Sequence, residues 1–145
     1  VKRLRQKARR VLVDAPCSGT GTLRRNPDLK WRQSPESVSE LCALQRSILA
    51  SAARCVAPGG RLVYATCSIL QAENEDQVEG FLAAHPEFEL LPASGALAGR
   101  AGALAMPGPY LKLRPDIHGT DGFFAAVLER RRDPGATTPQ AEGGA

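Results

Sequence analysis

Residues 11–22 read VLVDAPCSGTGT, and this stretch contains the first strand and the first loop of the predicted fold. The aliphatic run Val11-Leu12-Val13 is typical of a buried strand, and Pro16 stops it. The small residues that follow are typical of a loop. The strand therefore ends at Asp14, with Cys17 just beyond it. In sheets of parallel strands, ligands bind beyond this carboxyl end.

Outward from this stretch, helices alternate with strands. The predicted elements are a helix from Ser34-Pro35 to Pro58-Gly59-Gly60, a strand at 61–66, a helix that begins in the acidic stretch 73–76, a strand at 88–91, an extended stretch or strand at 111–115, and a strand at 123–128. The first part has the βαβ order of a parallel sheet with crossover helices. The last two strands are close enough in sequence to form an antiparallel edge. The predicted fold class is α/β.

Length and composition indicate one globular domain. The chain has 145 residues, of which 43% are apolar and 23% charged, which is ordinary globular composition. No apolar run is long enough to span a membrane. We place a domain at 1–132 and a disordered, Pro/Gly/Ala-rich tail at 133–145. Residues 1–10 hold six Lys/Arg and lack an apolar segment behind them, so we expect no secretory signal.

The charge distribution leaves two interpretations open. The net charge is +4, and residues 1–10 alone contribute six positive charges and no acid. Arginine is the better bidentate partner of phosphate, and a basic start is consistent with nucleic-acid binding. Taken alone, the feature favours a solvated segment.

The four cysteines divide into two kinds. The chain has no C-x-x-C motif and its histidines lie far from the cysteines, so we expect no metal site. Free thiols in a reducing compartment are then the default, which predicts a cytoplasmic protein. Cys42 and Cys55 fall within a predicted helix and indicate packing. Cys17 and Cys67 fall on loops at one sheet edge, where a thiol is either packed in a tight turn or a nucleophile.

Three blocks resemble the RNA (cytosine-5) methyltransferases of the RsmB/Sun/NOP family. They are VLVDAPCSGTGTLRRNPDLKWR at 11–32, PGGRLVYATCSILQAENEDQV at 58–78 and HGTDGFFAAVLER at 118–130. The resemblance is strongest to the bacterial ribosomal RNA enzymes, through the RRNPDLKW loop. It implies a Rossmann-like class I methyltransferase sheet, of which this chain is the C-terminal half. It also implies S-adenosylmethionine (SAM) as cofactor and a cytosine of 16S ribosomal RNA as target.

The resemblance assigns roles to three residues. Cys67 is the nucleophile that adds to C6 of cytosine, which makes C5 electron-rich enough to accept the methyl group. Cys17 is the second thiol, assigned to release of the enzyme. Asp14 lies where SAM and the base meet, and its carboxylate bonds the N3/N4 edge of cytosine. Thiol addition replaces one difficult step by easier ones, and the adduct then needs base-assisted elimination.

Four basic residues of the second loop are candidates for RNA contact. The target base must be unpaired or flipped into the pocket, and cations are needed for the phosphates on either side of it. A solvated loop is an equally good interpretation of these residues. They are Arg24, Arg25, Lys30 and Arg32.

The sequence also departs from the family pattern. The glycine-rich SAM loop after the first strand and the acid that holds the ribose hydroxyls are absent. We therefore expect the 145-residue chain alone to be inactive, and the full-length protein to be a monomer. One alternative is a non-catalytic RNA-binding remnant, which SAM binding would distinguish. A thiol-dependent hydrolase is a second alternative, but it requires a histidine beside a cysteine, and neither His85 nor His118 has an obvious placement there.

Overall fold

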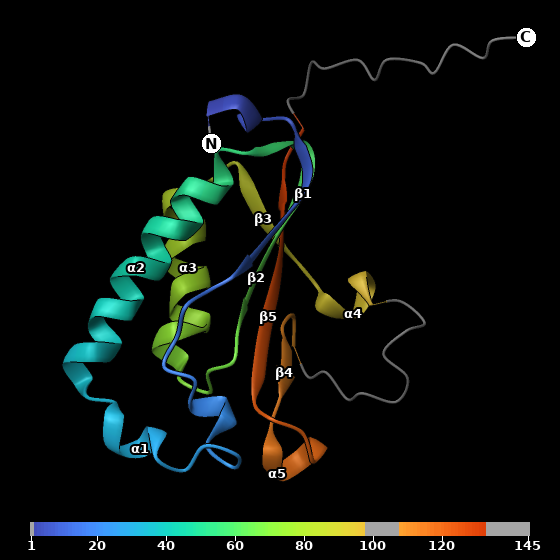
Figure 1. Ribbon diagram of the computed structural model, residues 1–145. Helices are drawn as coiled ribbons and strands as arrows, with labels where there is room; N and C mark the ends of the chain where they lie inside the picture. The colour runs from blue at the N-terminus through green and yellow to red at the C-terminus, as the bar shows by residue number, and fades with distance from the viewer. Residues whose placement is uncertain (1, 98–107, 133–145) are drawn as a thin grey trace, which may run out of the picture.

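The computed structural model describes residues 2–97 and 108–132. Within these ranges five strands form one sheet, whose order is β1-β2-β5-β3, with β4 also paired to β5 (Figure 1). The predicted tail at 133–145 lies outside the described residues. The strands are β1 (Ala8–Asp14), β2 (Val56–Thr66), β3 (Phe88–Leu91), β4 (Leu111–Leu113) and β5 (Phe123–Arg130).

The sheet is mixed, and the predicted α/β class with a Rossmann-like sheet is confirmed. β1 and β2 are parallel neighbours. β5 runs antiparallel to β2, β3 and β4, so β4 and β5 form the predicted antiparallel hairpin. The prediction that the last strands form an edge is wrong for β5, which lies between β2 and β3. Residues 124–128 of β5 are all buried, which suits a strand that has a neighbour on each side.

Two long helices cover one face of the sheet. These are α2 (Pro35–Ala53) and α3 (Glu75–Ala84), which contact each other and lie together to the left of the strands in Figure 1. None of the helices in the described ranges is long and apolar enough to cross a membrane. The shorter elements are the helices α1 (Leu29–Arg32), α4 (Ala93–Ala96) and α5 (Pro115–His118), and the 3-10 turns η1 (Lys2–Leu4), η2 (Thr20–Thr22) and η3 (Gln71–Glu73).

The core lies between these two helices and the sheet. Its members are buried apolar side chains of β1, β2, β5, α2 and α3, among them Val13, Leu49, Leu62, Phe81 and Phe124. The opposite face of β1 is open, because Leu12 is 69% exposed. Only part of the predicted run Val11-Leu12-Val13 is therefore buried, since adjacent residues of a strand point to opposite faces.

The first long helix begins as predicted and ends earlier. Ser34 caps it: the Ser34 side chain accepts from the Ser37 N–H, and the Ser37 side chain accepts from the Ser34 N–H. The helix ends at Ala53, so Cys55 lies outside it and is half-buried, which corrects the prediction that Cys55 packs within a helix. Residues 58–60 do not end the helix but lie inside β2.

The Pro-Gly-Gly segment produces an irregularity in the ladder between β1 and β2. The register passes from Ala8 opposite Val56 to Arg10 opposite Arg61, so β2 has extra residues at this point. Gly59 has φ 73°, a conformation that a side chain disfavours. Beyond the irregularity the register is even up to Asp14 opposite Ala65, which brings the carboxyl ends of both strands to the same level.

Candidate active site

The two loop cysteines meet at the carboxyl ends of β1 and β2. The Sγ atoms of Cys17 and Cys67 are 3.4 Å apart, and both residues are half-buried free thiols. Cys42 is buried on α2, where its thiol donates to the Ala72 carbonyl. The parallel pairing of β1 with β2 explains the meeting, since both loops leave the sheet at the same edge.

Close backbone contacts hold the loops together. The Gly21 N–H donates to the Cys67 carbonyl at 2.8 Å, and the Gly122 N–H donates to the Gly21 carbonyl at 2.8 Å. A Cβ added at Gly21 would lie 2.3 Å from the Gly122 oxygen and 2.6 Å from the Cys67 oxygen. Only glycine fits at this position, because the obstructing atoms belong to backbone.

A buried carboxylate lies behind the two thiols. Glu73 is fully buried in η3. It accepts hydrogen bonds from the Ser18 N–H at 2.8 Å, the Ser18 hydroxyl at 2.6 Å, the Ser68 hydroxyl at 2.5 Å and the Gln45 amide at 3.1 Å. The prediction that Glu73 lies in the first turn of the second long helix is wrong, since Glu73 is the last residue of η3 and α3 begins at Glu75.

The sequence contained a signal for this cluster. A serine directly follows each loop cysteine, as Cys17-Ser18 and Cys67-Ser68, and both serines are buried. Buried polar groups are nearly always hydrogen-bonded, and in the structure both hydroxyls donate to the Glu73 carboxylate.

Burial favours the protonated form of the Cys17 thiol. Burial raises the pKa of Cys17 from 9.0 to about 12, a hydrogen bond from the Gly19 backbone opposes the rise, and the neighbouring Cys67 adds to it. Cys17 therefore keeps its proton at neutral pH, and in the contact between the two sulfurs either thiol can be the donor. Because the thiolate is the nucleophilic form, this rise in pKa makes Cys17 a poorer nucleophile than an ordinary exposed thiol.

Asp14 lies at the same edge of the sheet with an exposed carboxylate. It is the last residue of β1 and is exposed, and within residues 2–97 and 108–132 its carboxylate accepts no hydrogen bond. A carboxylate with free acceptor sites can accept hydrogen bonds from a bound group. The role that the resemblance gives to Asp14 stays a prediction.

Arg24 and Arg25 are held by the loop before β5. Arg24 donates to the Gly119 carbonyl at 3.0 Å and lies 3.5 Å from Asp121, while Arg25 forms an ion pair with Asp121. These pairs lower the pKa of the Asp121 carboxyl, chiefly through the hydrogen bond from Arg25. Both guanidinium groups are exposed enough to contact a phosphate as well.

The other two basic candidates lie on α1. Arg32 pairs with Asp28 at 2.7 Å, one helical turn away. The Lys30 ammonium lies 4.8 Å from the centre of the Trp31 ring, and Trp31 is 81% exposed. An exposed indole beside cations is a surface on which a nucleic-acid base can stack. No observation tests the four predicted RNA contacts, which stay a prediction.

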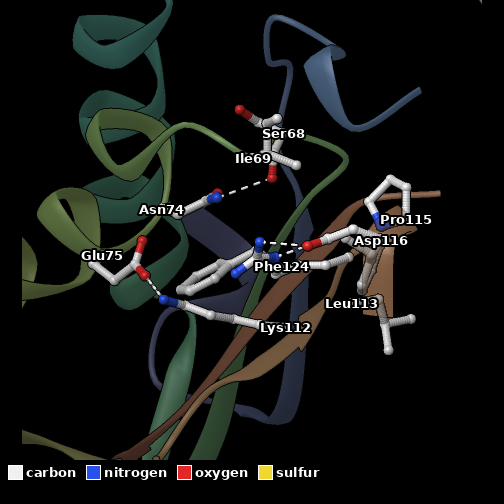
Figure 2. A pocket seen from close by; sticks show the side chains of 11 residues that line it. Ser68, Ile69, Asn74, Glu75, Lys112, Leu113, Pro115, Asp116 and Phe124 are labelled. Atoms are coloured by element: carbon white, nitrogen blue, oxygen red, sulfur yellow. Dashed lines mark hydrogen bonds and ion pairs between the residues drawn. The ribbon is translucent and has the colours of Figure 1, made fainter. Parts of the chain in front are cut away.

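A cavity of about 360 Å³ opens beside the second cysteine loop (Figure 2). Ser68 and Asn74 line one side, and the segment 112–116 lines the other. An ion pair between Lys112 and Glu75 crosses its mouth. The cavity is large enough for one nucleotide base, but Cys17, Cys67 and Asp14 are not among the described residues that line it.

The two histidines lie apart from this chemistry. His85 Nδ1 lies 3.0 Å from the Phe81 carbonyl, and its ring stacks on the Phe81 ring. His118 Nδ1 accepts from the Arg114 N–H at 3.0 Å. In the described ranges neither ring is hydrogen-bonded to a cysteine, so the geometry gives no support to a thiol-dependent hydrolase.

Comparison with known proteins identifies the class as methyltransferase and then the family. The sequence model described as "16S rRNA methyltransferase RsmB/F" matches residues 2–129. The chain belongs to this family, as the resemblance predicted. Ribosomal RNA small subunit methyltransferase B of Klebsiella pneumoniae is 47% identical over 124 residues, which are 86% of this chain and 26% of the relative.

Solved structures agree with the family assignment. The crystal structure of PH0851 shares 43% identity at a TM-score of 0.76, over 87% of this chain and 27% of that one. NSun6 from Pyrococcus horikoshii, solved with the SAM analogue SFG, shares 27% identity at a TM-score of 0.67, over 84% and 30% of the chains. The chain thus spans about a quarter of the length of the curated relative named above.

Proposed function

We propose that this chain is part of an enzyme that transfers a methyl group from SAM to C5 of a cytosine in 16S ribosomal RNA. The observation that carries the proposal is the pair of thiols, 3.4 Å apart at the carboxyl ends of two parallel strands. The family description and the methyltransferase relatives support the substrate and the reaction. A cytoplasmic location and a monomeric full-length protein belong to the same proposal.

The first step is addition to the ring. The Cys67 thiolate forms a bond to C6, and the electron pair of the C5–C6 double bond moves to C5. Asp14 orients the ring by accepting from the exocyclic amino group or from a protonated N3. When bound, SAM would supply an electrophilic methyl group to C5: the bond from this methyl group to the SAM sulfur would break, and S-adenosylhomocysteine would leave with the electron pair. Nucleophilic addition of this kind lowers the barrier at a carbon that is otherwise unreactive.

The second step releases the enzyme. C5 loses its proton to water, the C5–C6 double bond forms again, and the bond from C6 to the Cys67 sulfur breaks. The sulfur departs with the electron pair. Cys17, which holds a proton 3.4 Å away, donates a hydrogen bond to the departing sulfur and stabilises its charge. The raised pKa of Cys17 suits this role, since the proton is present at neutral pH.

RNA contacts complete the proposal. Arg24, Arg25, Lys30 and Arg32 lie on the segment that follows the Cys17 loop and are proposed to hold phosphates near the target. Cations at such positions set affinity and register and carry little sequence information.

The decisive experiment measures the covalent adduct in the full-length enzyme. Cys67→Ala is expected to abolish the denaturant-resistant complex with labelled 16S RNA. Cys17→Ala is expected to let the complex accumulate, because attack survives while release is slow. Cys55→Ala, which removes a half-buried thiol outside the pair, is the control and should match the unsubstituted enzyme.

Two results would contradict the proposal. A normal yield of adduct in Cys67→Ala would show that Cys67 is not the nucleophile. Equal loss of adduct in both variants would show that the two thiols do not have separate roles. An unsubstituted enzyme that binds RNA but not SAM would instead identify a non-catalytic RNA-binding remnant.

A further inference from the structure

We infer that Glu73 is a positioning residue, whose carboxylate holds the two cysteine loops at the separation that the thiol chemistry requires. Glu73 touches neither thiol, and it is bonded instead to the serine that follows each of them. The inference rests on the proposed function for its chemical consequence, but the geometry that it explains does not depend on that function.

The hydrogen bonds of Glu73 account for its burial. An ionised carboxylate offers about four acceptor sites, and four donors fill them: the Ser18 N–H and the Gln45 amide on Oε1, and the Ser18 and Ser68 hydroxyls on Oε2. A buried charge without such partners would be strongly unfavourable. Bonds to an ionised acceptor are also about twice as strong as neutral ones.

The carboxylate joins segments that are remote in sequence. Ser18 is 55 residues from Glu73, and Gln45 is 28 residues away on α2. Gln45 also donates to the Pro16 carbonyl at 2.9 Å, on the other side of Cys17. The Cys17 loop is therefore tied on both sides of the thiol to one buried cluster.

The backbone of Glu73 is fixed by β2 and its end. The Tyr64 hydroxyl donates to the Glu73 carbonyl at 2.6 Å. The next residue, Asn74, accepts from the Thr66 hydroxyl at 2.5 Å and donates to the Ser68 carbonyl at 2.9 Å. The strand that carries Cys67 thus holds Glu73 in place, and Glu73 in turn holds the Cys17 loop against that strand.

This arrangement has a specific chemical consequence. Attack by Cys67 needs only the base, whereas release needs Cys17 next to the departing sulfur. If the loops separate, attack continues and release slows. Glu73→Gln keeps the size of the side chain but replaces one acceptor oxygen by an N–H₂ donor, so either the two serine hydroxyls or the Ser18 N–H and the Gln45 amide lose their acceptor. Loss of a hydrogen bond to a charged group corresponds to roughly a 10- to 100-fold effect.

The test measures the thiol separation directly in the full-length enzyme, without RNA or SAM. Diamide oxidises two nearby thiols to a disulfide and is itself reduced to the hydrazine, which takes up both hydrogens. The rate of Cys17–Cys67 cross-linking, followed by mass spectrometry, should fall roughly 10-fold or more in Glu73→Gln. The lifetime of the RNA adduct should rise in the same variant, while the rate of adduct formation changes little.

The control is Phe88→Leu. Phe88 is buried on β3 and pairs with Arg130, whereas Phe124, at the other end of β5, pairs with Thr66 next to Cys67, so Phe88 is remote from both cysteine loops. In this control variant the two thiols should cross-link at the same rate as in the unsubstituted enzyme. This should hold even if urea unfolding shows that the control loses as much stability as Glu73→Gln. A merely structural role of Glu73 would slow both variants alike.

Each outcome decides the matter. An unchanged cross-linking rate in Glu73→Gln overturns the inference, whatever the RNA chemistry. Slower cross-linking together with no adduct in the unsubstituted enzyme supports the positioning role and refutes the proposed function. If Glu73→Gln does not fold, Ser18→Ala and Ser68→Ala each remove one bond to the carboxylate, and normal cross-linking in both would overturn the inference.

Discussion

Replacement of Gly21 by alanine should push apart the loops that carry Cys17 and Cys67 through steric repulsion. The new methyl group would lie 2.3 Å from the Gly122 oxygen, 2.6 Å from the Cys67 oxygen and 2.8 Å from the Gly122 carbonyl carbon. All three atoms are backbone, so no side chain can rotate away. The Cys67 loop or the segment before β5 has to move by about 1 Å to restore an ordinary contact distance.

The expected loss of stability follows from two contributions. The movement weakens the bonds from Gly21 N–H to Cys67 and from Gly122 N–H to Gly21, both 2.8 Å long, at about 1 kcal/mol each. Overpacking of a tight region adds about 1–3 kcal/mol. Gly21→Ala should therefore lower the free energy of unfolding by about 3–5 kcal/mol.

Urea unfolding of Gly21→Ala, with Gly80→Ala as the comparison variant, measures this loss. Gly80 is exposed on α3 and an added Cβ there meets nothing within 4 Å, so Gly80→Ala should raise stability by about 0.5–1 kcal/mol. Gly21→Ala should also slow disulfide cross-linking between the thiols. A loss below about 0.5 kcal/mol at Gly21, with normal cross-linking, would refute the view that backbone packing fixes the thiol separation.

Two further predictions concern the helix cap and alkaline pH. Ser34→Ala removes the hydroxyl that accepts from Ser37 N–H and should cost about 1 kcal/mol of stability; an unchanged thermal midpoint would show that α2 does not depend on its cap. The pKa of Cys17 is raised to about 12 in the folded chain, so the unfolded chain loses this proton first, and the stability that Cys17 contributes is present below pH 9 and lost as pH rises toward 12. In urea unfolding across this pH range, the free energy of unfolding of Cys17→Ala should decline less steeply than that of the unsubstituted chain. Part of the decline that persists is due to Tyr64, whose pKa burial also raises. Equal slopes in the two chains would contradict the raised pKa of Cys17.

Local signals were sufficient to predict the elements that surround the site. Ser34-Pro35 predicted the start of α2, and the structure shows the cap in place. The alternation of strands and helices predicted that Cys17 and Cys67 lie at one sheet edge. These inferences succeed because caps and strand ends depend on interactions within a few residues.

Long-range features could not be predicted in the same way. The place of β5 inside the sheet depends on pairing with β2 and β3, whose partners lie tens of residues away. Cys55 was assigned to a helix because the apolar pattern continues past Ala53, yet β2 begins at Val56. Helix ends and strand order are decided by tertiary pairing, which outweighs local propensity.

Glu73 shows why reactive residues are easier to predict than the residues that position them. A thiol at a strand end is recognisable from its own neighbours, whereas an acid is normally exposed, and only its partners reveal that it is buried. Those partners are nevertheless visible in the sequence as the repeated Cys-Ser step at 17–18 and 67–68, followed by an acid five residues after the second serine. Buried hydroxyls need hydrogen-bond partners, and in the structure Glu73, whose backbone is fixed by the strand that carries Cys67, accepts from both serines. The same logic predicts that neither serine is replaceable by alanine without an effect on the other loop, so the Ser18→Ala and Ser68→Ala losses in cross-linking rate should be non-additive when combined.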